Sequence, residues 1–457
     1  GDGESRFIES AQVTAKLQST LHLFDLIVGT EEEFHIAGGS TDTIAALRAV
    51  RAVSSATLVC KRGPMGAAAF TGAIPDSLEG GQTGPGFPIE VFNVLGAGDG
   101  FMSGLLKGWL DDEDWPTALK YANACGAFAV SRHGCAPAYP SWAELDFFLK
   151  RGVKEKALRK DAALEQIHWA TNRSNDWSTM RVFAFDHRMQ LEALDGASAD
   201  KIGAFKELCL EACLSVADGR KGYGLLCDSR LGRDALYKAA GQGLWIGRPV
   251  EWPGSRPLEL EPEIGPDYGG LSEWPLDHVV KCLCFYHPDD SAEMKAAQEA
   301  TVMRLFSAAR RNRLEFLLEV IPSKVAAVDD DTNAAIIRRF YDLGVYPDWW
   351  KLEPMTSDTA WQQACAAIDE NDPHVRGIVV LGLAAEEDAL AASFEVAARY
   401  PLVKGFAVGR TIFADVAAGY MAGNIAPEAA VQQMAQTYAR LCALWDHARA
   451  IAQEKAA

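Results

Sequence analysis

The chain has 457 residues, of which 49% are apolar and 23% are charged, as in a globular protein of two or three domains. Its formal net charge of -18 disfavours a nucleic-acid partner, since such a partner requires a basic face. An anionic substrate would have to bind in a local basic pocket. No apolar run approaches the ~20 residues that a membrane span needs, so we expect no membrane partner.

The ten cysteines include no CxxC pair, which indicates free thiols in a reducing compartment. No signal peptide is visible, and we therefore expect a cytoplasmic location. The oligomeric state stays open, a homo-oligomer included.

Residues 1–149 alternate short apolar runs with segments of helical spacing, which is typical of an α/β domain. The expected elements are strands over Leu23–Val28 and Ala56–Cys60, and helices over Thr41–Val53, from near Gly98 and from near Trp115. Pro116 suits the first turn of the last of these helices. Residues 150–178 are polar, basic and helix-prone, and we interpret them as a linker helix at a domain boundary.

Residues 179–457 contain eight strand-length apolar runs, each followed by a helical stretch. The runs are Val182–Phe185, Tyr223–Cys227, Leu244–Ile246, Val279–Tyr286, Leu314–Ile321, Trp349–Leu352, Gly377–Leu383 and Gly405–Val408. Helical stretches such as Ala292–Arg310 and Asp331–Leu343 separate them. This alternation predicts a (β/α)8 TIM barrel, whose catalytic groups lie at the carboxyl ends of the strands.

Ionisable residues stand at or near the ends of most of these runs. They are Asp186, Asp228, Arg248, Lys281, Glu319, Lys351 and Arg410. Any one of them is commonly a buried ion pair or, for Asp186, a helix cap. Their repetition at strand ends predicts a shared site, because opposite charges that converge on a barrel mouth can satisfy one another.

Lys351 is flanked by apolar residues, and partial desolvation together with a nearby Lys281 would favour its neutral amine. A neutral amine can attack a ketone and form a Schiff base. Glu319 is then expected to shuttle protons, and Asp186 to deprotonate the hydroxyl whose collapse breaks the carbon–carbon bond.

Four motifs in this region are Phe-Asp-His-Arg, Leu-Leu-Glu-Val, Trp-Lys-Leu-Glu-Pro and Phe-Ala-Val-Gly-Arg. They resemble the first, fifth, sixth and eighth strand motifs of the class I tagatose-bisphosphate-type aldolases, and the barrel fused to the sugar kinase of inositol catabolism. The resemblance implies Lys351 as the Schiff-base lysine, Glu319 as its proton-transfer partner, and Asp186 and Lys281 beside them, without a cofactor. The residues expected to bind the sugar phosphate are Asp228, Arg248, Gly382, Gly409 and Arg410.

Residues 93–101 read Asn-Val-Leu-Gly-Ala-Gly-Asp-Gly-Phe. Glycines before a helix leave backbone N–H groups free for a phosphate, although a tight turn with Asp99 as a helix cap fits the pattern too. The segment resembles the ribokinase-like (PfkB) sugar kinases, of which only the C-terminal part would be present. The resemblance implies an anion hole at Gly96, Ala97 and Gly98, with Asp99 as catalytic base. It also implies ATP beside Asn123 and magnesium near Glu33.

Together the resemblances imply cleavage of 2-deoxy-5-keto-gluconate 6-phosphate to dihydroxyacetone phosphate and malonate semialdehyde by a barrel fused to a 5-dehydro-2-deoxygluconokinase domain. Arg248 would hold the substrate carboxylate. Three alternatives remain: a kinase whose barrel is structural or senses sugar phosphates, a metal-dependent aldolase with His187 and His287 as ligands, and a non-enzymatic binding module.

Overall fold

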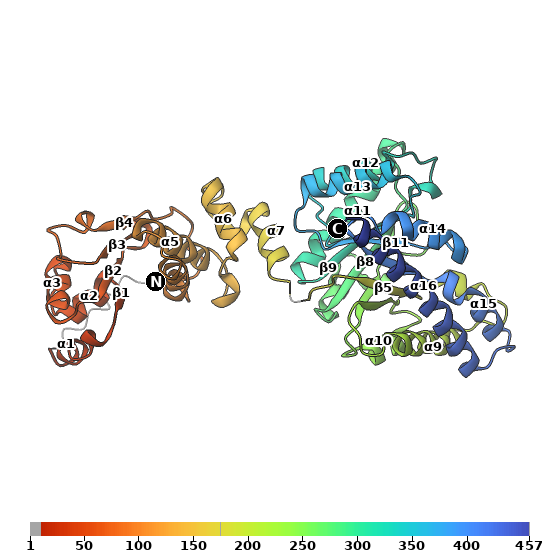
Figure 1. Cartoon of the computed structure of the whole chain (residues 1–457), viewed down its shortest axis with the longest axis horizontal. Coiled ribbons are helices and arrows are strands. Elements are labelled where there is room, and N and C mark those ends of the chain that lie inside the picture. Colours follow the sequence, from red (N-terminus) through yellow and green to blue (C-terminus); the bar gives the residue numbers. More distant parts are fainter. Residues whose placement is uncertain (1–10, 174, 457) are drawn as a thin grey trace. The chain divides into compact units, whose positions relative to one another are not determined.

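A computed structural model describes residues 11–173 and 175–456. The chain divides into two compact units, Gly1–Arg173 and Ser174–Ala457, here called the N-terminal unit and the barrel unit (Figure 1). Within the described residues, every helix is too short or too polar to cross a bilayer.

The N-terminal unit is built on a sheet with the strand order β1-β2-β3-β4, in which β1 and β2 are parallel and the other neighbours antiparallel. Its strands are β1 (Leu26–Thr30), β2 (Thr57–Lys61), β3 (Ala67–Phe70) and β4 (Gln82–Gly84). Its helices are α1 (Ala11–Gln18), α2 (Glu31–Gly38), α3 (Thr43–Val53), α4 (Ala97–Leu110), α5 (Trp115–Ser131), α6 (Trp142–Arg151) and α7 (Ala162–Thr171).

Alternate residues of β2 enter two different cores, because successive side chains of a strand point to opposite faces. Leu58 and Cys60 pack in a cluster with residues of α2 and α3, whereas Val59 packs in a cluster with residues of α4 and α5. The predicted strands and helices of this unit therefore exist. The first strand begins later than predicted, since Leu23 ends a short 3-10 helix and is exposed.

The segment 150–178 differs from the predicted linker helix. It contains the end of α6, a 3-10 helix over Leu158–Lys160, and α7. Leu158 and Leu164 pack in one cluster with Phe128 and Phe148 of the N-terminal unit, so the segment is tied to that unit and the division falls after Arg173. Its many basic residues predicted a solvated linker, because the two buried leucines between them do not recur at a helical or strand spacing.

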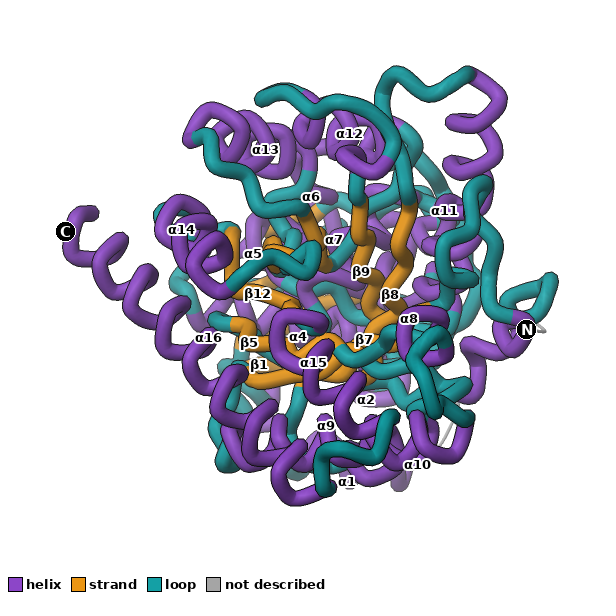
Figure 2. The backbone as a smooth tube through the Cα atoms, turned by 90° about the vertical axis from the view of Figure 1, so that its right-hand side faces the viewer, coloured by secondary structure: helices purple, strands orange, loops and turns teal. Residues whose placement is uncertain are grey.

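The barrel unit contains eight parallel strands that close on themselves in the order β5-β6-β7-β8-β9-β10-β11-β12. They are β5 (Met180–Ala184), β6 (Tyr223–Leu226), β7 (Trp245–Pro249), β8 (His278–Cys284), β9 (Glu315–Val320), β10 (Trp349–Leu352), β11 (Gly377–Leu381) and β12 (Val403–Val408). In Figure 2, β8 and β9 run side by side, as their register requires.

The helices that follow the strands complete the (β/α)8 architecture. They are α8 (Met189–Glu192), α9 (Ala199–Ala217), α10 (Arg233–Ala239), α11 (Ala292–Arg311), α12 (Thr332–Asp342), α13 (Asp358–Asn371), α14 (Glu387–Ala397), α15 (Arg410–Met421) and α16 (Pro427–Ala456). This confirms the TIM barrel predicted from the alternating pattern.

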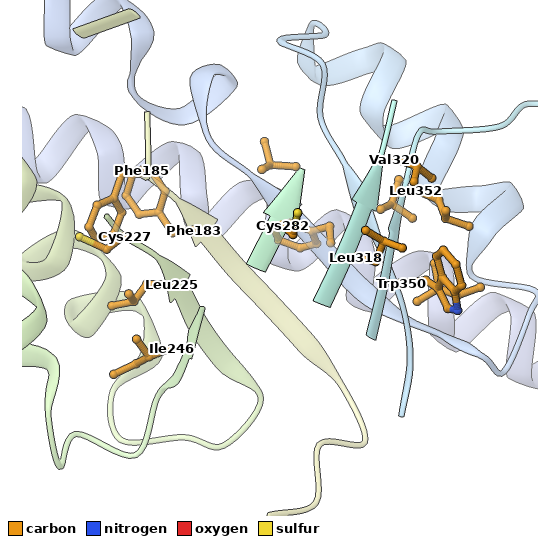
Figure 3. Packing of buried hydrophobic residues seen from close by; sticks show 14 of the residues in the cluster. Phe183, Phe185, Leu225, Cys227, Ile246, Cys282, Leu318, Val320, Trp350 and Leu352 are labelled. Atoms are coloured by element: carbon orange, nitrogen blue, oxygen red, sulfur yellow. The ribbon is translucent and has the colours of Figure 1, made fainter. Parts of the chain in front are cut away.

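Strand alternation sorts the barrel side chains into an outer and an inner set. The outer set packs between strands and helices; Figure 3 shows Phe183, Cys282, Leu318, Trp350 and others of this set. The inner set fills the barrel with Met180, Val182, Ala184, Leu226, Trp245, Val279, Leu317, Trp349, Val379 and Ala407. These ten residues form an apolar cluster inside the barrel, so a charge placed directly above them is shielded from water on that side.

Candidate active site

A cavity of about 540 Å³ opens at the carboxyl ends of the barrel strands. Its ionisable lining residues are Asp186, His187, Arg188, Glu251, Arg256, Lys281, Glu319, Lys324, Lys351 and Arg410. This is the end of the barrel at which TIM-barrel enzymes carry their sites.

The strand alternation explains why charges gather there. Lys351 lies two residues after Trp349, and Glu319 two residues after Leu317, so each continues an inner row one layer above the apolar core. Lys351 and Glu319 are also direct neighbours in the register of β10 and β9. Lys281 enters the same region from β8 by the same alternation, two residues after Val279.

Lys281 lies at the centre of an ion-pair network. Its Nζ atom is 2.8 Å from Oε2 of Glu319 and 3.2 Å from Oδ2 of Asp186. The other oxygen of Glu319, Oε1, is 2.8 Å from Nζ of Lys351. All four residues are at most 7% exposed. Glu319 thus bridges the two lysines, and the structure brings together the four catalytic residues predicted for the barrel.

The electrostatics of the network favour charged side chains. Burial lowers the pKa of Lys281, but the carboxylates around it outweigh burial and hold that pKa well above its ordinary value. Burial raises the pKa of Asp186, yet attraction to Lys281 leaves it well below the ordinary value. The pKa of Glu319 is likewise lowered, because Lys281 and Lys351 outweigh burial. Lys281 is therefore a fixed cation, and the two carboxylates beside it are ionised.

The segments that follow β11 and β12 contain three of the residues predicted to bind phosphate. Gly382, Gly409 and Arg410 all line the cavity. A Cβ atom on Gly409 would overlap the carbonyl oxygen of Ala184, so only glycine fits there. Arg410 begins α15, and its side chain makes no hydrogen bond or ion pair with any described residue. Its guanidinium and the helix N-terminus are both available to an anion.

Two predicted substrate residues lie elsewhere. Asp228 is 1% exposed; it is ion-paired with Lys206 and accepts from the backbone N–H of Leu231 at 2.7 Å, away from the cavity lining. Arg248 occupies an outward position of β7, where its guanidinium lies 3.8 Å from the ring centroid of Trp274. The prediction that Arg248 holds a substrate carboxylate is corrected accordingly: alternation turns it out of the barrel.

The histidines considered as metal ligands do not gather. His187 lines the cavity, and removal from water lowers its pKa to about 4. His287 is held in its loop, where Nε2 contacts the carbonyl oxygen of Ala327 at 3.0 Å. Among residues 11–173 and 175–456, no group of three or more His, Cys, Asp or Glu side chains is arranged to hold a metal ion.

Four ionisable lining residues were missed from the sequence: Arg188, Glu251, Arg256 and Lys324. Glu251 accepts from Lys281 at 2.8 Å and is 3.1 Å from Arg188. The alternation Trp245, Gly247, Pro249 and then Glu251 was a usable signal, but Glu251 lies past the apolar run that was taken as the strand. Arg256 and Lys324 lie in loops, which carry no periodic pattern.

The glycine turn of the N-terminal unit forms the start of helix α4. Gly96 is the N-cap of α4 with a left-handed φ of 79°, and its carbonyl accepts from Tyr139 at 3.0 Å. Ala97 and Gly98 follow in the first turn, together with an exposed Asp99 that is not itself the cap. A Cβ on Gly98 would meet only Nζ of Lys61, at 3.7 Å. The turn is open, with one lysine beside it.

The other predicted nucleotide and metal residues have structural partners. Glu33 forms a capping box with Thr30: its Oε2 accepts from the Thr30 N–H at 2.6 Å, and its own N–H donates to the Thr30 hydroxyl at 3.2 Å. Asn123 is buried in α5 and donates to the Leu119 carbonyl one turn earlier at 2.9 Å. Both side chains are thus engaged within the N-terminal unit.

Residues 144–449 match a family described as "Uncharacterized protein conserved in bacteria (DUF2090)". The chain belongs to the DUF2090 family. The match begins within α6, so the DUF2090 region includes the whole barrel up to most of α16.

Residues 5–142, ahead of the DUF2090 region, match the pfkB family carbohydrate kinases. A 5-dehydro-2-deoxygluconokinase of Geobacillus kaustophilus is 30% identical over 142 residues, which are 30% of this chain and 40% of that relative. An ATP-dependent ribose-1-phosphate kinase of Halopiger xanaduensis is 39% identical over 80 residues, 18% of this chain and 27% of that relative. The chain thus spans less than half of these relatives, and a partial ribokinase-like domain precedes the barrel, as predicted.

Two solved structures are similar to parts of the DUF2090 family chain. A fructose-bisphosphate aldolase from Plasmodium falciparum covers 63% of this chain and 95% of its own, with 12% identity and a TM-score of 0.45. A nucleoside kinase from Burkholderia thailandensis covers 31% of this chain and 45% of its own, with 23% identity and a TM-score of 0.26.

Proposed function

We propose that the barrel is a Schiff-base (class I) aldolase and that Lys351 is its nucleophile. The observation that supports this most directly is the 2.8 Å contact between Nζ of Lys351 and Oε1 of Glu319 in a buried network that lines a cavity. A lysine can become a nucleophile only if its proton has an acceptor within hydrogen-bond reach, and Glu319 provides one.

In the first half of the reaction, Glu319 takes a proton from Lys351, and the free amine attacks the ketone carbon of the substrate. Glu319 then returns the proton to the carbinolamine oxygen, which leaves as water and gives a protonated imine. Since Glu319 also contacts Lys281 at 2.8 Å, its carboxylate is held in place during both transfers.

In the second half, a carboxylate removes the proton from the hydroxyl on the β carbon. We assign this step to Asp186, because only its Oδ2 contacts Lys281, while its Oδ1 lies 3.8 Å from Nδ1 of His187. The hydroxyl becomes a carbonyl, the bond between the α and β carbons breaks, and its electron pair neutralises the iminium nitrogen. Protonation of the resulting enamine at the α carbon and attack by water release the second product and Lys351.

The cations of the cavity support a substrate with two anionic ends. Arg410 and the Gly409 backbone would bind a phosphate, while Lys324, in the loop after β9, would face a carboxylate in place of Arg248. Arg256 lines the cavity from the loop after β7, but it is ion-paired with Asp290. A ketose acid phosphate has this charge distribution. Together with the 5-dehydro-2-deoxygluconokinase relatives, it favours 2-deoxy-5-keto-gluconate 6-phosphate as the substrate, with dihydroxyacetone phosphate and malonate semialdehyde as the products.

For the N-terminal unit we propose descent from a sugar kinase that uses ATP and magnesium. The start of α4 fits a phosphate group, because Gly98 is exposed there, Lys61 is close by, and a helix N-terminus attracts anions. Asp99 would accept the proton of the attacking hydroxyl. Asn123 and Glu33 fit ATP and magnesium less well, since their side chains are engaged in α5 and in the helix cap.

Reductive trapping tests the proposal. The full chain is incubated with dihydroxyacetone phosphate or another ketose phosphate and sodium cyanoborohydride, and its peptides are mapped by mass spectrometry. We expect one covalent adduct, on Lys351. If no ketose phosphate labels any lysine, or if the adduct lies on another lysine, Lys351 is not a Schiff-base nucleophile.

A further inference from the structure

Glu251 is a third carboxylate on Lys281, and the aldolase steps above leave it without a role. It lies just beyond β7, where it forms an isolated bridge with Leu260. Its side chain is 3% exposed and reaches the same ammonium group as Asp186 and Glu319, at 2.8 Å. A buried carboxylate in contact with a catalytic network requires an explanation, because burying a charge is costly.

The hydrogen bonds of Glu251 show that it is poorly suited to carry protons. Its Oε1 accepts from Lys281 and from Arg188, and its Oε2 accepts from the backbone N–H of Leu283 at 3.0 Å. Both oxygens are therefore occupied by donors that do not take part in the reaction. In Glu319, by contrast, Oε1 contacts the nucleophile itself.

Arg188 and Glu261 form a second set of charged residues that fixes Glu251. Arg188 is 3.1 Å from Glu251 and 2.9 Å from Glu261, and it also donates to the backbone carbonyl of Glu251 at 3.0 Å. Arg230 lies 3.8 Å from Glu261 on the outer side. Lys351, Glu319, Lys281, Glu251, Arg188 and Glu261 thus form one buried chain of alternating sign.

We infer that Glu251, anchored by Arg188, is a positioning residue that keeps Lys281 protonated and fixed between Asp186 and Glu319. In this way Glu251 sets the upper end of the pH range in which Lys351 forms and uses its imine. The inference rests on the proposed aldolase function. It assigns to Lys281 the role of a permanent cation rather than that of a proton donor.

The charges that face Lys281 determine the direction of the effect. Asp186 enters after β5, Glu319 on β9 and Glu251 after β7, and all three stabilise its charge. Lys351 on β10 and Arg188 after β5 add like charges nearby. Without the Glu251 charge, two carboxylates remain against these cations, and Lys281 loses its proton at a lower pH.

The experiment compares Glu251→Gln with Glu259→Gln, a matched change at an exposed glutamate of the same loop. The rate of cyanoborohydride trapping of dihydroxyacetone phosphate on Lys351 is measured from pH 5 to pH 10. For Glu251→Gln we expect the alkaline limb to move to lower pH by roughly one unit or more, and the maximal rate to fall roughly 10- to 100-fold. Glu259→Gln should match the unaltered chain, and Glu251→Asp should restore the position of the limb although not the full rate.

The outcomes separate this inference from the proposed function. If the unaltered chain is never trapped, the aldolase proposal fails. If the chain is trapped but Glu251→Gln keeps the unaltered pH profile, whatever its rate, Glu251 does not position Lys281. Should Glu251→Gln not fold, Glu261→Gln serves instead. Arg188 would then interact with Glu251 as its only carboxylate partner, so Glu251 would stabilise the charge of Lys281 less. We expect a smaller shift of the alkaline limb in the same direction, and an unchanged pH profile overturns the inference.

Discussion

The barrel mouth and the glycine turn before α4 carry the two predicted reaction centres, and they differ in how many predicted side chains contact one another. At the barrel mouth, Lys351, Glu319 and Lys281 come from three strands and Asp186 follows a fourth, and each contacts the next within 3.2 Å. At the turn, Asp99 is exposed and the nearest predicted partners are engaged in helix caps or helix interiors.

The difference shows what preorganisation requires. A closed barrel directs every second residue of each strand to one axis, so that side chains far apart in sequence meet without any loop having to order. A helix N-terminus supplies backbone donors locally, yet it brings in no distant side chain by itself. The barrel therefore brings four ionisable side chains together, whereas the turn presents an open helix start with Lys61 beside it.

The largest effect at the barrel mouth is expected when the proposed nucleophile is removed. Lys351→Met should lower carbon–carbon cleavage by roughly 10⁴-fold or more, because it removes the amine on which the proposed imine forms. Lys404→Met is the control: Lys404 is half-buried on β12 but lies outside the cavity lining. Steady-state assays of both variants with the ketose phosphate identified by trapping measure the effect, and equal activities would refute the assignment.

Asp186→Asn separates the two halves of the reaction. We expect cleavage to fall by roughly 10²- to 10⁴-fold, since the base for the β-hydroxyl is lost, while imine trapping on Lys351 stays within several-fold of the unaltered chain. Parallel cleavage and trapping assays on one preparation distinguish these steps. A loss of trapping as large as the loss of cleavage would place Asp186 in imine formation instead.

Gly409→Ala and Gly98→Ala compare how tightly the backbone is packed at the barrel mouth and at the glycine turn before α4. Gly409→Ala should destabilise the barrel by about 1–3 kcal/mol, because the new Cβ overlaps the Ala184 carbonyl oxygen. Gly98→Ala should change stability by less than about 1 kcal/mol, since its Cβ would meet only the end of the Lys61 side chain in a helical first turn. Urea unfolding followed by circular dichroism measures both, and a larger loss for Gly98→Ala would contradict the open turn.

The smallest expected effect is at Glu33. Glutamine also serves at the third position of a capping box, so Glu33→Gln should change the free energy of unfolding by less than about 0.5 kcal/mol, whereas Thr30→Ala should cost about 1 kcal/mol. The same urea titrations compare the two variants. A large loss in Glu33→Gln would mean that its charge has a further role beside Lys61.

The sequence was sufficient to predict the barrel strands and several of the charged residues that line its cavity. Apolar runs of strand length followed by helical spacing predicted all eight strands, and β10 was predicted with its observed ends. In the structure, two-residue alternation puts Lys351 and Glu319 on the inner face of the barrel. The same rule, applied past Pro249, would have found Glu251, and applied to Arg248 it would have turned that residue outward.

What the sequence determined by itself is local: strand and helix positions, the glycine turn before α4, and which strand ends carry charge. Only the tertiary structure decided which charges meet. Barrel closure and register bring Lys281 against three carboxylates from different strands and loops, while Asp228 pairs with Lys206 of α9 instead. Periodicity fixes the face on which a side chain lies, but the contact between distant segments depends on strand order and loop path, which no local pattern encodes.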